Sequence, residues 1–154
     1  MLCFRETAIG RVGLREEDGF IVRLHLPDRS EAVSEGPETP VIREAFEQLE
    51  AYFAGRRKTF DLPLRMEGTP FMQKVWRALC DVPYGKTASY GDIAKAVGNP
   101  KACRAVGMAN NRNPIAIIVP CHRIVGGNGK LVGYGGGLDM KRRLLDLERA
   151  HAAD

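Results

Sequence analysis

The pattern of apolar residues changes at Glu67-Gly68-Thr69-Pro70, and this change limits the folds that the chain can adopt. Before it, apolar residues alternate with polar ones in two stretches, as in a β-strand, and have helical spacing only between Thr39 and Gly55. After it, they recur every three or four residues, as in a helix. The charge changes too: residues 1–68 hold ten Lys or Arg and thirteen Asp or Glu, whereas residues 69–154 hold thirteen and six. We therefore expect an α+β fold with two domains, residues 1–68 and residues 69–154.

The first 66 residues predict a small acidic α+β unit. A turn at Glu17-Asp18-Gly19 precedes a strand whose alternating apolar residues are Phe20, Val22, Leu24 and Leu26. Thr39 and Pro40 are residue types that begin a helix, and apolar residues follow at helical spacing up to Gly55. Residues 60–66 alternate again, and Pro63 among them indicates an edge strand.

Residues 89–112 predict a helix-turn-helix. Ser89 and Asp92 have the spacing of a capping box and begin a short helix, which Gly98-Asn99-Pro100 separates from the next one. The second helix of such a motif contacts nucleic acid, and here it carries Lys101, Arg104 and Arg112. The basic charge of residues 69–154 favours the same partner, although a solvated basic surface explains that charge equally well.

One cysteine has neighbours of the residue types that make a thiol reactive. Residues 115–119 are all apolar and predict a buried strand or extended segment that leads to Pro120-Cys121-His122-Arg123. A thiol reacts as the thiolate, which a neighbouring base or cation favours. Glu148 lies in a last helix whose expected inner residues are Met140, Leu144 and Leu147, and it has the residue type that would orient His122. From these residues alone, a core cysteine and a solvated Glu148 remain open alternatives.

Composition excludes several classes of protein. Hydrophobic residues make up 44% of the 154 residues and charged residues 27%, which is typical of a globular chain and excludes disorder. We find no apolar run long enough to span a membrane and no secretory signal, so we expect a cytoplasmic protein. The four cysteines form no C-x-x-C pair, and the chain has only three histidines as further metal ligands, so we expect no metal site and no cofactor.

Several motifs within residues 70–148 together resemble the O6-alkylguanine-DNA alkyltransferase family. The motifs are Arg104-Ala105-Val106-Gly107, Asn113-Pro114, Pro120-Cys121-His122-Arg123-Ile124-Val125 and Tyr134 to Leu138. The resemblance implies a ribonuclease-H-like N-terminal α/β domain, followed by a mostly helical, winged-helix-like C-terminal domain with a helix-turn-helix. It also implies direct repair of DNA, in which the alkyl group of O6-alkylguanine moves irreversibly to Cys121 in a single turnover. Activity on O4-alkylthymine is left open.

The resemblance implies a role for each of five catalytic residues. Cys121 is the nucleophile, His122 the base that acts through a water, and Glu148 the group that orients His122. Asn113 holds the segment around the nucleophile. Tyr90 donates a proton to the guanine ring, so that guanine leaves as a neutral base.

The resemblance also implies a DNA-binding face and a base pocket. The partner is a duplex that contains O6-alkylguanine, bound by a monomer through the minor groove with the alkylated nucleotide rotated out of the stack. Arg104 fills the space that the nucleotide leaves, and small residues beside it allow close approach. The DNA-binding residues are Lys101, Arg104, Ala105, Gly107, Arg112 and Arg123, and the pocket residues are Ile124, Tyr134, Gly135, Gly136 and Lys141.

Two other functions stay open from the residues themselves. A non-catalytic helix-turn-helix protein, either a regulator or a lesion sensor, would explain the basic half of the chain, and Cys121 would be dispensable for it. A cysteine hydrolase would use Cys121 and His122 and would turn over many times, whereas an alkyltransferase stops after one equivalent.

Overall fold

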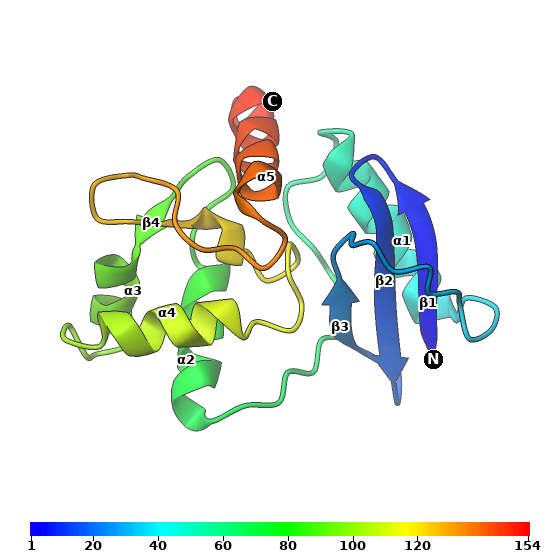
Figure 1. The fold of residues 1–154 in the computed structure, drawn as a ribbon, viewed down its shortest axis with the longest axis horizontal. Coiled ribbons are helices and arrows are strands. Elements are labelled where there is room, and N and C mark those ends of the chain that lie inside the picture. Colours follow the sequence, from blue (N-terminus) through cyan, green and yellow to red (C-terminus); the bar gives the residue numbers. More distant parts are fainter. The chain divides into compact units, whose positions relative to one another are not determined.

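The computed structural model describes all of residues 1–154 and divides them into two compact units. The first unit comprises residues 1–66 with 114–118, and the second comprises residues 67–113 with 119–154. The first unit contains a sheet and a helix, whereas the second is mostly helical (Figure 1). This α+β architecture confirms the predicted fold class.

The first unit is a three-stranded antiparallel sheet covered by one helix. The strands β1 (Leu2–Thr7), β2 (Gly10–Glu17) and β3 (Phe20–His25) lie in the order β1-β2-β3, and α1 (Pro40–Phe53) packs against all three. The Thr39 hydroxyl accepts a hydrogen bond from the Ile42 amide and caps α1. Gly55, with a φ of 75°, follows the helix in the left-handed conformation that glycine favours. The predicted helix is thus confirmed at both ends.

Two strand predictions are wrong in detail. The register between β2 and β3 shifts at Arg15 and Glu16, so that Ile21 is buried at 0% exposure and Phe20 is 39% exposed. Residues 60–66 form no strand, since only Leu64 makes an isolated bridge, to Ile21. The Pro63 carbonyl accepts a hydrogen bond from the Ile21 amide, but Pro63 has no N–H with which to extend the β-ladder.

The apolar run before the predicted nucleophile is buried, as expected, but turns instead of continuing as a strand. The Leu24 amide donates to the Pro114 carbonyl, and Ile115 bridges to Leu24. The Ile118 amide then donates to the Ala116 carbonyl at 2.9 Å, around Ile117 with a φ of 74°. A β-branched residue rarely adopts this conformation, so the turn is a strained one held by burial.

The second unit is built from four helices and a minimal parallel sheet. The helices α2 (Pro70–Cys80), α3 (Tyr90–Ala96) and α4 (Cys103–Asn111) pack against one another, and α5 (Leu138–His151) contacts the 3₁₀ turn η1 (Cys121–Arg123). The strands β4 (Ala88–Ser89) and β5 (Ile124–Val125) pair in parallel. Ser89 and Asp92 make both hydrogen bonds of a capping box, so the predicted start of α3 and its pairing with α4 are confirmed.

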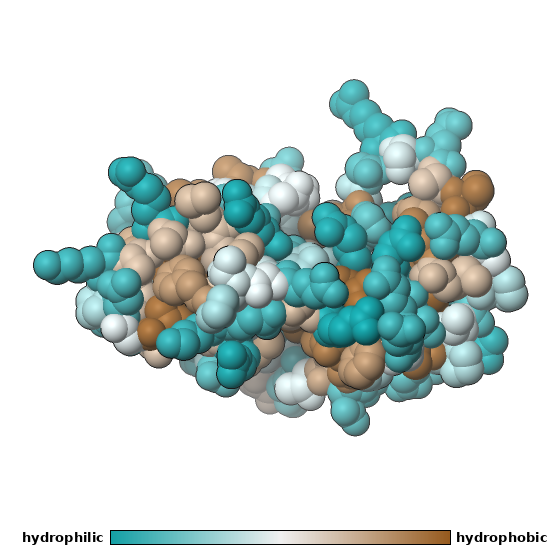
Figure 2. All heavy atoms as spheres, turned by 90° about the horizontal axis from the view of Figure 1, so that it is seen from below, coloured by the Kyte–Doolittle hydropathy of each residue, from teal (hydrophilic) through white to brown (hydrophobic).

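On the face drawn in Figure 2, hydrophilic side chains cover much of the surface, with patches of hydrophobic side chains between them. None of the helices combines the length and the apolar character that crossing a membrane requires.

Candidate active site

A tight turn in the second unit presents Cys121. The Cys121 amide donates to the Val119 carbonyl at 2.8 Å, around Pro120 with φ −83° and ψ 65°. The Asn113 Nδ2 donates to the same carbonyl at 2.8 Å, and the Asn113 side chain also hydrogen-bonds the Cys121 thiol. Asn113 therefore holds both the backbone before Cys121 and its sulfur.

His122 forms a fully buried pair with Glu148 from α5. The distance from His122 Nε2 to Glu148 Oε2 is 2.7 Å, and neither side chain is exposed. A carboxylate only accepts, so Nε2 carries the hydrogen and Nδ1 keeps the lone pair that can take a proton. Burial lowers the pKa of His122 more than Glu148 raises it, so the ring is neutral at neutral pH. His122 is thereby oriented as a base.

Arg123 completes this buried group, and its expected place on the DNA face is wrong. It is 7% exposed, its Nε and Nη2 donate to the two Glu148 oxygens at 2.8 and 3.0 Å, and its Nη1 donates to the Val82 carbonyl. The Gly85 amide donates to Glu148 as well. Because the guanidinium is committed to Glu148, it orients that carboxylate and balances its charge. Its positive charge also helps to lower the pKa of His122.

Lys141 places a positive charge near Cys121. Its buried Nζ donates to the carbonyls of Val132 at 2.7 Å and Gly133 at 3.3 Å. Burial raises the pKa of the Cys121 thiol, while the Asn113 hydrogen bond and the Lys141 charge oppose that rise. Cys121 therefore rests as a thiol, beside groups that favour the thiolate once the proton has a base to accept it.

Two tyrosines near Cys121 keep their protons. Burial, with a smaller effect of Cys121, raises the pKa of Tyr90 and raises that of Tyr134 further. Tyr90 makes only a long contact, 3.5 Å, to the Val132 carbonyl, and the Tyr134 hydroxyl is buried with no hydrogen-bond partner. Both phenols are therefore available as donors to a bound molecule.

The remaining predicted residues divide into exposed and buried positions. Lys101, Arg104, Ala105 and Arg112 are exposed on α4 or beside it. Gly107 is half-buried, and a Cβ there would lie 3.7 Å from the Tyr90 ring. Gly135 is exposed and Gly136 half-buried, in the loop before α5. Ile124, expected in the pocket, is fully buried and pairs with Ala88, so it belongs to the core.

The helix-turn-helix and the buried thiol beside a histidine–carboxylate pair define a class: a nucleic-acid-binding protein built around a reactive cysteine. Two family descriptions then match the chain. Residues 4–66 match the 6-O-methylguanine DNA methyltransferase ribonuclease-like domain, and residues 70–150 match the DNA binding domain of the same family. The chain therefore belongs to the 6-O-methylguanine DNA methyltransferase family, and the resemblance seen in its sequence is confirmed.

Similar proteins cover nearly the whole chain. The constitutive methylated-DNA--protein-cysteine methyltransferase of Bacillus subtilis is 53% identical over 152 residues, which cover 94% of this chain and 92% of that protein. The protein of the same name from Methanosarcina acetivorans is 67% identical over 106 residues, 69% of this chain and 68% of that one. The structure of Mycobacterium tuberculosis OGT in complex with DNA has a TM-score of 0.88 at 45% identity, and the match covers 97% of this chain and 93% of that one.

Proposed function

We propose that this chain repairs DNA by moving the alkyl group from O6 of guanine to Cys121, once per protein molecule. The observation that carries the proposal is the buried His122–Glu148 pair, 2.7 Å between Nε2 and Oε2, next in the chain to a thiol that Asn113 and Lys141 favour as thiolate. The family of the chain and the names of its relatives support this reaction.

The proposed transfer is a single displacement. His122, through a water, takes the proton of the Cys121 thiol, and the thiolate attacks the alkyl carbon. A carbon–sulfur bond forms as the carbon–O6 bond breaks, and its electron pair passes to guanine. Tyr90 donates a proton to the ring, so that guanine leaves neutral. The proton that the thiol loses balances the one that guanine gains, and the thioether product does not exchange as a disulfide does.

We propose that α4 contacts the DNA, with the protein acting as a monomer at the minor groove. Lys101, Arg104 and Arg112 are exposed and cationic. The small side chain of Ala105 allows the helix to approach the DNA closely. A base whose O6 reacts must leave the duplex stack, because that atom is inaccessible within it. We assign Arg104 to the space that the base vacates.

The number of lesions repaired per protein molecule tests the reaction. The protein is incubated with a tenfold excess of duplex that carries one O6-methylguanine, and restored guanine is counted. We expect restoration to stop at one equivalent. Continued turnover would indicate a hydrolase, and specific binding without restoration would indicate a lesion sensor; either result would contradict the proposal.

Arg104→Ala tests the DNA-binding role separately from the chemistry. We expect slower repair in duplex DNA and an unchanged rate with the free base O6-benzylguanine, since the side chain acts only when a base leaves a duplex. Lys95→Ala, an exposed cation on α3, is the matched control. Equal losses on both substrates would contradict the assignment.

A further inference from the structure

A turn between α2 and β4 contacts the buried group around Glu148 and has no assigned part in the proposed reaction. It comprises residues 82–86 and is called the 82–86 turn below. The Lys86 amide donates to the Pro83 carbonyl at 3.0 Å, and Gly85, between them, has a φ of 77°. A positive φ at the third position is typical of a type II β-turn. The turn leaves the Gly85 amide unused within itself, and this amide donates to α5 instead.

The 82–86 turn makes three contacts with Arg123 and Glu148. The Val82 carbonyl accepts a hydrogen bond from Arg123 Nη1 at 2.8 Å. The Arg123 guanidinium lies 5.7 Å from the centroid of the Tyr84 ring, within the range of a cation–π contact. The Gly85 amide donates to Glu148 Oε1 at 3.1 Å. Both members of the buried ion pair are therefore held by the same turn.

The 82–86 turn lies so close to α5 that residue 85 has no room for a side chain. A Cβ on Gly85 would lie 2.8 Å from the Cβ of Ala152, which is one helical turn beyond Glu148. Its positive φ also disfavours any residue with a Cβ. The backbone of the turn is thus fitted to the part of the helix that carries Glu148.

Arg123 determines how the charge of Glu148 acts on His122. Burial lowers the pKa of His122, the Glu148 carboxylate raises it, and the charges of Arg123 and Lys141 lower it again. A protonated ring has no lone pair with which to accept the thiol proton. The other titratable groups that face these residues are Cys80, Tyr84, Cys121 and Tyr134. Burial raises the pKa of each of these four, so all are uncharged at neutral pH.

We propose that Tyr84 and Arg123 are positioning residues for the transfer to Cys121. Tyr84 holds the guanidinium against Glu148, and the guanidinium balances the carboxylate. His122 then stays a neutral ring whose Nδ1 accepts the thiol proton through a water. The inference rests on the proposed function, since His122 is the base only in that reaction. Both residues act through Glu148 and His122, not on the DNA.

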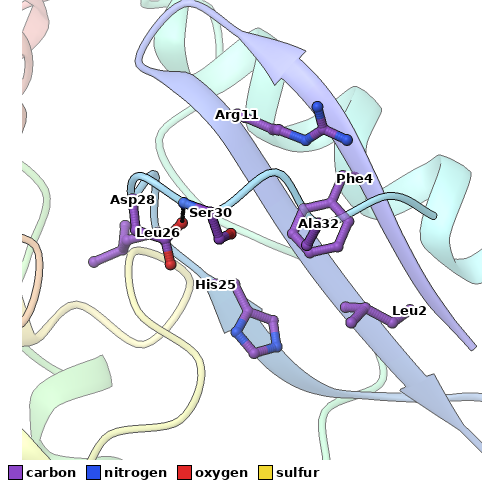
Figure 3. A pocket seen from close by; sticks show the side chains of 8 residues that line it. All are labelled: Leu2, Phe4, Arg11, His25, Leu26, Asp28, Ser30 and Ala32. Carbon is purple, nitrogen blue, oxygen red and sulfur yellow. Dashed lines mark hydrogen bonds between the residues drawn. The ribbon is translucent and has the colours of Figure 1, made fainter.

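The protonation of the His122 ring tests the inference in unreacted protein. The ring signals of the histidines are followed by NMR as the pH is lowered from 8. The internal reference is His25, which Figure 3 shows in a pocket on the sheet of the first unit. We expect the midpoint of His122 to rise by at least about one pH unit in Arg123→Met and about half a unit in Tyr84→Leu. The midpoint of His25 should stay unchanged.

Two control variants separate the role of the Tyr84 ring from a general loss of packing. Tyr84→Phe keeps the ring beside the guanidinium and should leave the His122 midpoint within about 0.2 pH unit of the wild type. Phe53→Leu removes a buried ring from α1 in the first unit, so it should lower stability without moving that midpoint. Tyr84→Leu retains every charge, so the test does not depend on the folding of Arg123→Met.

The pH dependence of methyl transfer gives a second readout. The rate is measured with saturating methylated duplex, and duplex affinity is measured separately. In Tyr84→Leu we expect the fall in rate on acidification to begin at a pH higher by the shift that NMR detects. At pH 8.5 the rate, like the duplex affinity, should lie within about twofold of the wild type.

Three results would overturn the inference: a His122 midpoint unchanged in both Arg123→Met and Tyr84→Leu, an equal shift in Phe53→Leu, or a rate that Tyr84→Leu lowers equally at every pH. The last two would mean that the ring only stabilises the fold. Failure of the wild type to transfer the methyl group would instead overturn the proposed function. The NMR titration distinguishes these cases, because it needs no reaction.

Discussion

Cys3 in the first unit and Cys121 in the second are both buried thiols, 0% and 6% exposed, and burial raises the pKa of each. Their polar neighbours differ. The Cys3 thiol faces the carbonyls of Gly36 and Pro37 at 3.5 and 3.8 Å, and the charge of Glu38 raises its pKa further. Cys121 has an amide donor and a cation instead. Burial is therefore common to a core cysteine and a proposed nucleophile, and the charges around the sulfur distinguish them.

The largest effect should come from removing each thiol in turn. Cys121→Ala should abolish methyl transfer, because the accepting sulfur is gone. Cys3→Ala should leave the rate unchanged and lower the free energy of unfolding by about 1–2 kcal/mol, the range for losing a small buried group. Intact mass after incubation with methylated duplex measures the first, and urea unfolding the second. Transfer by Cys121→Ala would mean that another thiol accepts the group.

Glu148→Gln should cost both activity and stability, because it leaves Arg123 buried without a counter-charge and His122 without its orienting carboxylate. We expect a rate loss of about a hundredfold or more. We also expect a stability loss of about 3–5 kcal/mol, as for other broken buried pairs. Glu38→Gln removes the partly exposed partner of Arg5 and should cost no more than about 1 kcal/mol. Urea unfolding measures the free energy of unfolding of both variants. Similar losses in the two would contradict the conclusion that burial makes the ion pair of Glu148 more important than that of Glu38.

Lys141→Met should make Cys121 more like Cys3. Loss of the nearby cation raises the pKa of the thiol, and we expect iodoacetamide to modify Cys121 about tenfold more slowly at pH 8. Arg142→Met, at the next and exposed position of α5, should change the rate by less than about twofold. A pH series of modification rates separates a raised pKa, which shifts the whole curve, from a distorted site, which lowers the plateau.

The smallest expected effect is the change of the transfer rate and of the stability with pH. Because the pKa of His122 is lowered in the folded protein, the ring should stay neutral and the transfer rate should hold from pH 8 down to about 6.5. The rate should fall only at lower pH, as the base becomes protonated. Stability should fall over the same range, because the unfolded chain takes up a proton near pH 6.5 that the folded one resists. Rapid-quench rates and urea midpoints at each pH measure both, and a rate that rises on acidification would contradict the assignment of His122.

Capping residues in the sequence predicted where two helices begin. The inner face of α5 was predicted wrongly, because charged residues are buried on it. Thr39 and Ser89 cap their helices through bonds to residues three positions away, which a sequence pattern captures. The inner face of α5 was predicted from Met140, Leu144 and Leu147, whereas the buried residues are Lys141, Leu144, Leu145 and Glu148. Partners distant in the chain, such as Arg123 for Glu148, make those charges tolerable inside.

Contacts between residues distant in the chain also decide which site residues could be placed from the sequence. Cys121, His122 and Glu148 were expected together from their residue types, and the structure brings His122 and Glu148 into contact. The resemblance implied a place for Arg123 on the DNA-binding face, and arginines are normally exposed. The apolar residues Ile124 and Val125 that follow it were the signal in the sequence that this segment is buried. The turn at Ile117 had no signal, because β-branched residues in an apolar run predict a strand.

The most direct test of the account is to locate the methyl group after one turnover. Protein that has reacted with a duplex containing one O6-methylguanine is digested, and the peptides carrying Cys3, Cys80, Cys103 and Cys121 are compared by mass. We predict one methyl group, on Cys121 alone, with the buried Cys3 and the two exposed cysteines unmodified. A methyl group on any of the other three, or its absence from all four after the guanine is restored, would contradict the account.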